Sequence, residues 1–318
     1  MHIVFLDAYT VNPGDLDWDT LCQLGELTCH DRTAPEEVLE RSADADVLIV
    51  NKTRLTREHF DKLPKLRLVC VAATGYDKID LAAAREHGVP VCNCAGYSTP
   101  SVTQSVLSLL LEAADSTGEY ARLNAAGKWS ESPDFCYTLR PRIELAGKQA
   151  AIVGFGNIGA STAAVLHALG MDIAAVTSKT AAALPGYVRK VSLEEAFATS
   201  AVVSLHCPLT ADNARMVDAE LLAKAADGLI IVNTARGGLI DEEAVAAALR
   251  SGKLGAYCAD VLTAEPPSPA CPLFSAPHAF LTPHIAWNTP EARRRILAQL
   301  VENIAAFKAG KPRNVVNA

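Results

Sequence analysis

The sequence lacks a hydrophobic run long enough to cross a membrane. Even the apolar stretch at residues 106–111 stops at Glu112, whereas a membrane helix needs roughly 18 or more apolar residues. The first residues also lack the basic start and small-residue cleavage site of a signal peptide, and residues 2–7 have the composition of a strand. We therefore expect a protein that does not span a membrane and that lies in the cytoplasm.

An excess of positive charge is also missing. The 318 residues include 29 Lys and Arg against 36 Asp and Glu, which gives a net charge of −7. Proteins that bind nucleic acid through its phosphates present a basic face. The charge balance therefore argues against a nucleic-acid partner.

Paired cysteine motifs are absent, although the chain contains nine cysteines. The number is odd, no CxxC group occurs, and most of the cysteines lie in or beside apolar runs, which is typical of reduced core residues. Cys92 and Cys94 could form a metal or redox pair, but further ligands at zinc spacing are missing. We predict no metal site.

What the sequence does contain is a repeated alternation of short apolar strands and helical segments. The expected strands fall into two series: residues 3–7, 26–29, 47–50, 67–72 and 89–92, then 149–153, 172–177, 201–205, 229–233, 254–260 and 280–282. Continuous apolar strands separated by helices indicate a parallel sheet covered on both faces. We predict an α/β fold with two doubly wound parallel-sheet domains.

Two helices define the expected domain boundaries. Thr99 and Pro100 are typical of a helix start and open an apolar helix to about residue 114, which we expect to join the domains. Residues 290–308 also have helical spacing, and because six strands complete the second sheet, this helix should return to the first domain. We expect a first domain of residues 1–98, completed by residues 288–318, and a second domain of residues 99–287.

A glycine motif marks the start of the second strand series. Gly154, Gly156 and Gly159 form a GxGxxG pattern directly after a strand and before a helix. In dinucleotide-binding folds the first glycine allows a tight turn, the second lets the backbone approach a pyrophosphate, and the third lets helix and strand pack closely. We predict dinucleotide binding; a purely structural glycine turn and a methyltransferase-like site are the alternatives.

The next strand ends without the acidic residue that usually binds the ribose of NAD. Thr177, Ser178 and Lys179 stand there instead, and hydroxyls with an ammonium group attract a 2′-phosphate that a carboxylate would repel. We therefore favour NADP(H) over NAD, with Ser178 and Lys179 as phosphate ligands. The alternative is a solvated loop in which Thr177 or the backbone binds a 2′-hydroxyl.

Three further segments follow expected strands of the second domain, at residues 233–238, 260–266 and 282–286. With the glycine loop, their order and spacing resemble the D-2-hydroxyacid dehydrogenase family over essentially the whole chain. Residues 7–16, 73–77 and 133–137 are most similar to the branch of glycerate dehydrogenases, or hydroxypyruvate (glyoxylate) reductases. The resemblance implies a flavodoxin-like substrate domain, a Rossmann cofactor domain and a homodimer built on the cofactor domains.

The implied reaction is reduction of a small 2-oxo acid, such as hydroxypyruvate or glyoxylate, to its D-2-hydroxy acid with NAD(P)H. Arg236 can bind the substrate carboxylate and stabilise charge on the keto oxygen. His284 can donate the proton, and Glu265 can orient the imidazole and raise its pKa. Without these roles, Arg236 would be a surface ion-pair residue, Glu265 a loop cap and His284 an ordinary histidine.

The resemblance also implies binding roles for other positions. Backbone amides of Thr74, Gly75 and Tyr76 would hold the substrate carboxylate together with Arg236. On the cofactor side it implies amides of Asn157 and Ile158 for the pyrophosphate, Cys207 and Pro208 for the adenine side, and Thr234, Ala235 and Asp260 for the nicotinamide side. The roles of Asn51 and Lys52 stay open, and Tyr76 and Trp287 either set substrate size or pack the protein.

Other functions are compatible with the same fold. Formate dehydrogenases of this family carry Gln where Glu265 stands, which disfavours that activity, whereas a phosphite-oxidising relative remains an alternative. A dinucleotide-sensing, corepressor-like interaction protein is the alternative from a different class, since fold alone does not separate it from an enzyme.

Overall fold

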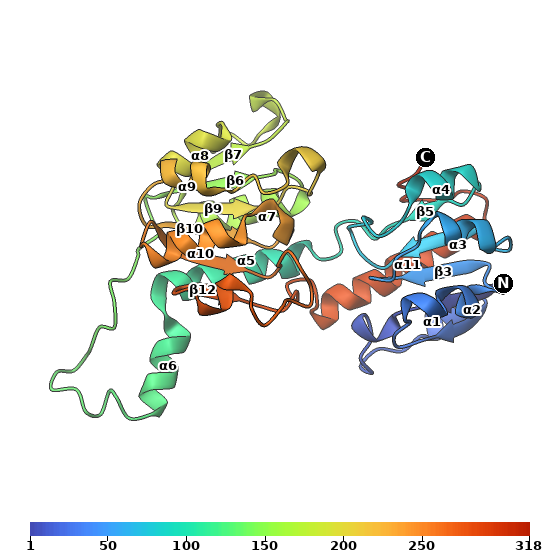
Figure 1. Ribbon diagram of the computed structural model, residues 1–318, viewed down its shortest axis with the longest axis horizontal. Coiled ribbons are helices and arrows are strands. Elements are labelled where there is room, and N and C mark those ends of the chain that lie inside the picture. The colour runs from blue at the N-terminus through green and yellow to red at the C-terminus, as the bar shows by residue number, and fades with distance from the viewer. The chain divides into compact units, whose positions relative to one another are not determined.

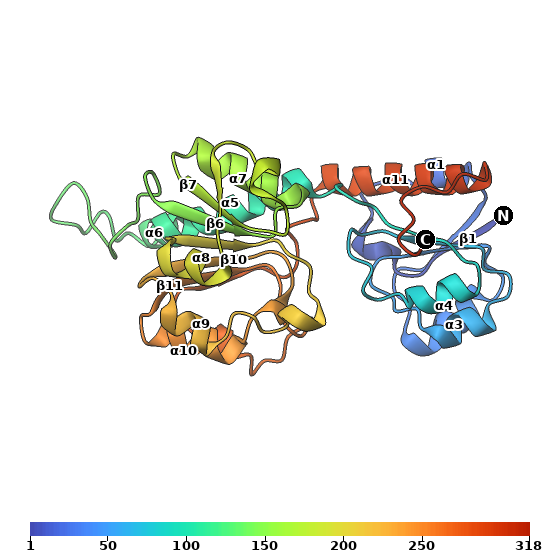
Figure 2. The same ribbon diagram turned by 90° about the horizontal axis from the view of Figure 1, so that it is seen from above.

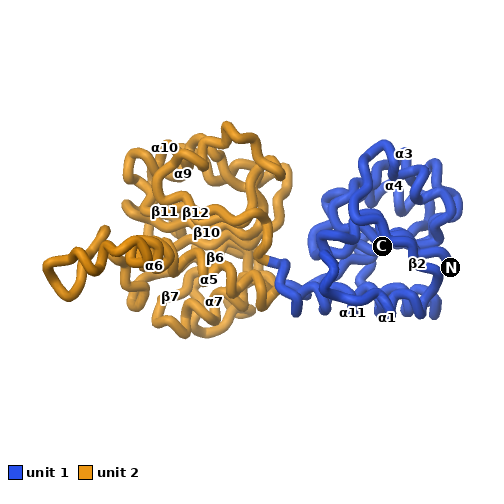
Figure 3. The backbone as a smooth tube through the Cα atoms, turned by 90° about the horizontal axis from the view of Figure 1, so that it is seen from below, with its two compact units in different colours: residues 1–98, 287–318 blue, residues 99–286 orange.

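The computed structural model describes residues 1–318, which form two compact units. The first contains residues 1–98 and 287–318, and the second contains residues 99–286 (Figure 3). Trp287 belongs to the first unit, so the expected boundary was wrong at this residue. The reason is packing, because the Trp287 ring contacts Tyr97 of the first unit edge to face, with 6.3 Å between the ring centroids.

The sheet of the first unit has five parallel strands in the order β2-β1-β3-β4-β5. They are β1 (His2–Phe5), β2 (Glu26–Cys29), β3 (Val47–Val50), β4 (Leu68–Val71) and β5 (Val91–Cys92). All five expected strands are present. The order is that of flavodoxin-like folds, so the predicted fold of this unit is confirmed.

β3 and β4 are buried along their whole length because helices cover both faces of this sheet. The side chains of Ile3, Phe5 and Ile49 pack with α1 (Asp19–Cys22) and α11 (Pro290–Lys308). Side chains of alternate strand positions pack on the opposite face, where α2 (Val38–Ser42), α3 (Arg57–Lys62) and α4 (Leu81–Glu86) lie (Figure 2). The long helix at the C-terminal end of the chain therefore completes the core of the first unit.

The sheet of the second unit has seven parallel strands in the order β12-β11-β10-β9-β6-β7-β8. They are β6 (Gln149–Val153), β7 (Asp172–Val176), β8 (Val188–Lys190), β9 (Val202–Leu205), β10 (Leu229–Asn233), β11 (Leu254–Ala259) and β12 (Ala279–Leu281). The strand order reverses between β6 and β9, as in a Rossmann fold, which confirms the predicted fold class. The expectation of six strands was wrong because β8 is a three-residue edge strand with two charged residues.

The faces of the second sheet are covered by two groups of helices. α5 (Thr99–Asp115) and α7 (Asn157–Ala168) pack against one another on one face. On the other face, α8 (Leu193–Thr199), α9 (Ala219–Lys224) and α10 (Glu242–Arg250) contribute buried side chains to a core that includes Phe197, Leu222 and Val245. Figure 2 shows the two groups on opposite sides of the sheet.

An arm projects from the second unit. α6 (Thr117–Ala125) has no buried residue, and it is followed by a loop that extends away from the sheet before the chain returns to β6 (Figure 1). In this loop the side chains of Trp129 and Phe135 are 56% and 90% exposed. The arm therefore presents large apolar side chains that have no core of their own.

No helix has both the length and the apolar character needed for a membrane span. No three His, Cys, Asp or Glu side chains come together as metal ligands.

Replacing Leu300 by Ala tests how much α11 stabilises the first unit. Leu300 is fully buried against the sheet, and truncation of a buried Leu costs about 2–5 kcal/mol of unfolding free energy. We expect a loss of this size in denaturant unfolding. The control is Arg294→Ala on the exposed side of the same helix, which should change stability by about 0.5 kcal/mol or less. Equal effects of both substitutions would contradict the packing role.

Candidate active site

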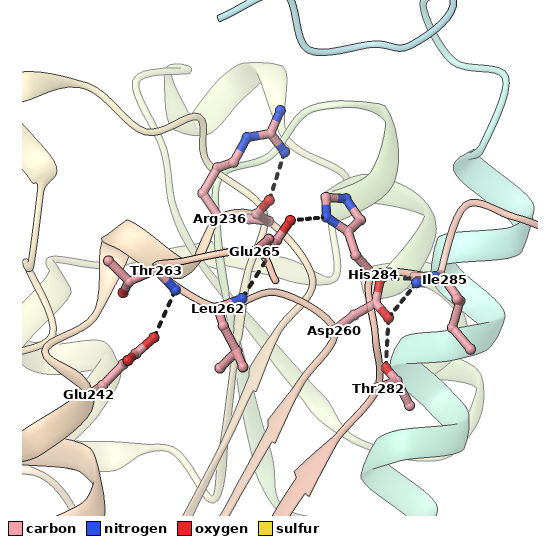
Figure 4. A network of polar contacts seen from close by, with 11 residues as sticks. Arg236, Glu242, Asp260, Leu262, Thr263, Glu265, Thr282, His284 and Ile285 are labelled. Atoms are coloured by element: carbon pink, nitrogen blue, oxygen red, sulfur yellow. Dashed lines mark hydrogen bonds and ion pairs between the residues drawn. The ribbon is translucent and has the colours of Figure 1, made fainter. Parts of the chain in front are cut away.

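The candidate catalytic residues lie on three loops at one edge of the second sheet. Arg236 follows β10, Glu265 follows β11 and His284 follows β12, and these three strands are neighbours in the sheet. The carboxyl ends of parallel strands meet at the same edge, where ligands bind in open α/β folds. The strand order therefore gathers residues 236, 265 and 284 at one place (Figure 4).

Glu265 and His284 form a hydrogen-bonded pair. His284 Nδ1 donates to Glu265 Oε2 at 2.6 Å, and Glu265 Oε1 accepts from the backbone amide of Leu262 at 3.1 Å. The side chain of His284 is 23% exposed, and that of Glu265 is 36% exposed. The carboxylate thus holds Nδ1 and fixes the orientation of the imidazole ring.

The backbone of His284 is in the left-handed region, with φ of 55°. This conformation is uncommon for a residue other than glycine and is found where the surrounding structure holds it in place. Here the His284 amide donates to the Thr282 carbonyl at 3.0 Å, which closes a tight turn. The turn aims the imidazole at Glu265.

Asp260 holds the segment that carries His284. Its side chain is buried, and Oδ1 accepts from Thr282 Oγ1 at 2.6 Å and the Ile285 amide at 2.8 Å, while Oδ2 accepts from the Ala286 amide at 2.8 Å. Burial raises the pKa of Asp260, and these hydrogen bonds oppose the shift. The sequence indicated Asp260 only through its expected place beside the nicotinamide; its bonds to the loop were not foreseen.

Asn233 shapes the loop of Arg236. This fully buried amide donates through Nδ2 to the Arg236 carbonyl at 3.0 Å, and its Oδ1 accepts from the Ala235 amide at 3.1 Å. The Arg236 side chain donates from Nη1 to the Ala235 carbonyl at 2.7 Å. Sequence reasoning missed Asn233, and the signal was a buried polar residue at the last position of an apolar strand.

Gly237 allows the loops after β10 and β11 to touch. A Cβ atom at this position would lie 2.0 Å from the carbonyl carbon and 2.2 Å from the carbonyl oxygen of Leu262. Real Cβ atoms do not approach so closely, so only glycine permits this crossing. The crossing brings the loop of Arg236 beside the loop of Glu265.

The three glycines of the motif differ in what surrounds them. Gly154 has φ of 93°, and a Cβ there would lie 2.5 Å from the Cys207 amide nitrogen, while a Cβ at Gly159 would lie 2.1 Å from the Gly154 carbonyl oxygen. Gly156 instead faces open space, with no atom within 4 Å of a Cβ. It caps α7, whose first amides, including those of Asn157 and Ile158, lack helical partners and suit an anion.

The segment after β9 lies against this glycine loop. The His206 amide donates to the Val153 carbonyl at 2.7 Å, and the His206 ring lies 2.8 Å from Ser204 Oγ. Burial lowers the pKa of His206 to about 4 and raises the pKa of Cys207. Cys207 and Pro208, expected on the adenine side, therefore sit next to the loop as neutral groups.

Thr234, which the sequence analysis placed on the nicotinamide side, has a hydroxyl without a partner. Thr234 Oγ1 is buried and makes no hydrogen bond within the chain. Buried polar atoms are nearly always hydrogen-bonded in folded proteins. An orphan hydroxyl next to Ala235 therefore fits a site that receives a polar group from a bound cofactor.

The loop after β7 carries a cationic side chain toward the glycine loop. The Lys179 amide donates to Thr177 Oγ1 at 3.2 Å, and Lys179 Nζ lies 5.7 Å from the centre of the Phe155 ring. Phe155 is the residue between the first two glycines of the motif. Lys190, which the sequence analysis did not single out, donates to the Lys179 carbonyl at 2.6 Å.

The expected substrate residues of the first unit follow β4. Thr74 Oγ1 donates to the Cys94 carbonyl at 3.1 Å, and Asn93 Nδ2 donates to the Thr74 carbonyl at 2.8 Å. Gly75 comes next, and Tyr76 has a side chain that is 39% exposed. These bonds tie the start of the loop down and leave its tip accessible.

Asp7 organises the loop that carries Asn51 and Lys52. Its buried carboxylate accepts from the amides of Asn51 at 2.7 Å, Lys52 at 2.5 Å and Thr53 at 2.8 Å. Asn51 Nδ2 also donates to the Ala72 carbonyl at 2.7 Å. Asn51 thus connects the ends of β3 and β4, and Asp7 was missed because its role depends on the parallel pairing of β1 with β3.

Comparisons with known proteins show which family the chain is similar to. Residues 107–286 match the family described as D-isomer specific 2-hydroxyacid dehydrogenase, NAD binding domain. The chain is 43% identical to a hydroxypyruvate reductase of Blautia hydrogenotrophica, with full coverage of both chains. It is 39% identical to a glycerate dehydrogenase of Methylorubrum extorquens over 89% of each chain.

A solved structure extends the similarity to three dimensions. An acyclic imino acid reductase, crystallised in complex with NADPH and D-Arg, superposes with a TM-score of 0.87 at 27% identity. The match covers 99% of this chain and 100% of the other. The similarity therefore includes both units of the fold.

Replacing Gly237 by Ala tests the crossing of the two loops. The new methyl group must displace the backbone of Leu262, so we expect a loss of unfolding free energy of about 1–3 kcal/mol, the usual cost of forced overpacking. The measurement is denaturant unfolding. Gly186→Ala is the control, because a Cβ there meets no atom within 4 Å. A Gly237→Ala protein as stable as this control would show that the crossing is loose.

Proposed function

Because this chain belongs to the D-isomer specific 2-hydroxyacid dehydrogenase family, whose members are oxidoreductases acting on CH–OH groups, we propose that it reduces a small 2-oxo acid of the hydroxypyruvate or glyoxylate type. The product is the D-2-hydroxy acid. The names of the two similar proteins support this substrate class. One observation carries the proposal. His284 Nδ1 lies 2.6 Å from Glu265 Oε2, at the same sheet edge as Arg236.

In the proposed reaction His284 acts as the proton donor. A nicotinamide dinucleotide, when bound, supplies the hydride that adds to C2 of the substrate. The carbonyl π bond breaks, and the keto oxygen takes a proton from His284 Nε2, so that one C–H bond and one O–H bond form. Glu265 keeps Nδ1 hydrogen-bonded and thereby stabilises the protonated ring before transfer.

Arg236 binds and orients the substrate in this proposal. A guanidinium group can form paired hydrogen bonds with a carboxylate and also stabilise negative charge on the neighbouring oxygen. Its loop is fixed by Asn233 and Gly237, which limits the conformations of the side chain. We propose that the first unit serves substrate binding and that amides of Thr74, Gly75 and Tyr76 take part in it.

The second unit is an NAD-binding domain of this family, and we propose that its cofactor is NADP(H). Residues 173–193 contain no Asp or Glu, so the end of β7 offers no carboxylate to a ribose 2′-hydroxyl. Ser178 and Lys179 offer a hydroxyl and an ammonium group to a 2′-phosphate instead. The other proposed contacts are amides of Asn157 and Ile158 above the three glycines, Cys207 and Pro208 at the adenine, and Thr234, Ala235 and Asp260 near the nicotinamide.

We further propose that the protein is a homodimer formed through the second unit. The arm, which consists of α6 and the loop after it, exposes Trp129 and Phe135. Large exposed apolar side chains are typical of interaction surfaces. A second copy is the partner that the resemblance implies. A cytoplasmic location remains a prediction from the sequence.

Replacing His284 by Asn tests the proposed proton donor. Asn tolerates the left-handed backbone at this position but does not titrate, so kcat for hydroxypyruvate should fall by about a hundredfold or more. The affinity for the dinucleotide should not change. His278→Asn is a matched control, because His278 has a similar φ of 57° and lies outside the site.

The outcome separates the two main hypotheses. If the His284→Asn variant keeps its turnover, His284 is not the proton donor. Tight dinucleotide binding with negligible turnover of every 2-oxo acid by the unmodified protein would instead favour a dinucleotide sensor.

Replacing Lys179 by Asp tests the cofactor proposal. A carboxylate at the end of β7 repels a 2′-phosphate and can accept a hydrogen bond from a ribose hydroxyl. We expect KM for NADPH to rise by at least about tenfold, as loss of one charge-assisted contact predicts, and KM for NADH to fall or stay constant. If the ratio of the KM for NADPH to the KM for NADH stays unchanged, the loop after β7 does not contact the phosphate.

A further inference from the structure

A second cation stands beside Lys179 at the edge of the sheet. β7 and β8 pair in parallel, with Ala175 opposite Lys190. The carboxyl ends of parallel neighbours lie at the same edge, so Lys190, the last residue of β8, lies near the loop where β7 ends. The expected binding region for the adenosine ribose therefore contains two lysines.

The contact between them is specific. Lys190 Nζ donates to the backbone carbonyl of Lys179 at 2.6 Å, and the amide of Lys179 donates to Thr177 Oγ1 at 3.2 Å. These bonds connect residues 177–179 to one another and to the end of β8. A lysine ammonium has three hydrogen atoms to donate, and the carbonyl uses one of them. Two remain for an anion held next to Ser178.

The neighbouring cation on the same strand is used differently. Arg189 forms an ion pair with Glu195 of α8 and donates to Gln149 Oε1 at 3.0 Å. Successive residues of a strand point to opposite faces of the sheet. Arg189 is therefore directed away from the loop after β7, whereas Lys190 reaches it.

We propose that Lys190 is a second determinant of cofactor choice, which binds the 2′-phosphate of the adenosine ribose together with Ser178 and Lys179. The inference rests on the proposed use of NADP(H) and adds a residue that comes from a different strand. One proton of its ammonium fixes the loop and the other two face the phosphate. Residues 173–193 contain no Asp or Glu, so neither the loop after β7 nor β8 offers an acidic group to this pair of charges.

Binding of two nucleotides that differ only in the 2′-phosphate tests the inference without measuring turnover. Adenosine 2′,5′-bisphosphate and adenosine 5′-monophosphate are titrated calorimetrically into the full-length protein. Lys190→Met should weaken binding of the bisphosphate about tenfold, as loss of one charge-assisted contact predicts, and leave the monophosphate unchanged. Lys190→Arg should retain most of the affinity, and Arg189→Met is the matched control that should not affect the difference between the nucleotides.

The possible results distinguish this inference from the proposal on which it rests. If the unmodified protein binds both nucleotides equally, the NADP(H) proposal fails and Lys190 loses its ligand. If the unmodified protein prefers the bisphosphate and Lys179→Met abolishes the preference while Lys190→Met does not, only the role of Lys190 is refuted. Equal weakening of both nucleotides by Lys190→Met would show that Lys190 merely holds the loop, which also refutes the contact.

Discussion

The hydrogen bonds accepted by Asp260 are the interaction on which the candidate site depends. A buried carboxylate is costly unless several donors compensate it, and here Thr282, Ile285 and Ala286 all donate to it. Because His284 lies between these donors in the chain, the same bonds hold its unusual backbone. The position of the imidazole is therefore set by a residue that directly follows β11, and then by its own bond to Glu265.

The sheet order explains why three distant residues meet. β10, β11 and β12 are adjacent and parallel, so their following loops must lie side by side. With a side chain at position 237, the loops after β10 and β11 would be held apart. Because residue 237 is glycine, its backbone can contact the backbone of Leu262 directly. Asn233 then fixes the start of the Arg236 loop from inside the core. Rigid backbone contacts thus place flexible side chains.

The sequence was informative where a pattern is local. Apolar runs located all strands except β8, whose three residues include two charges, and the spacing of glycines after β6 predicted the turn that the structure contains. The bonds of Asp7, Asp260 and Lys190 could not be predicted, because each joins segments that only the folded sheet brings together. The bonds of Asn233 to Ala235 and Arg236 are local, and a polar residue at the end of an apolar strand was the signal for them. Glu265 and His284 were paired in advance through the family resemblance, not through spacing alone.

The reversal of strand order separates two tasks along one sheet edge. Arg236, Glu265 and His284 follow strands on the β9 side of the reversal, whereas Lys179 and Lys190 stand on the β6 side, at β7 and β8. The glycine loop after β6 lies between the two groups, and Phe155 within it contacts the Lys179 side chain. The hydrogen bonds of Lys179 and Lys190 are made within the β7 and β8 edge, to Thr177 and to each other. Substitutions at the β8 edge that change which cofactor is preferred can therefore occur without altering the bonds that orient the His284 imidazole.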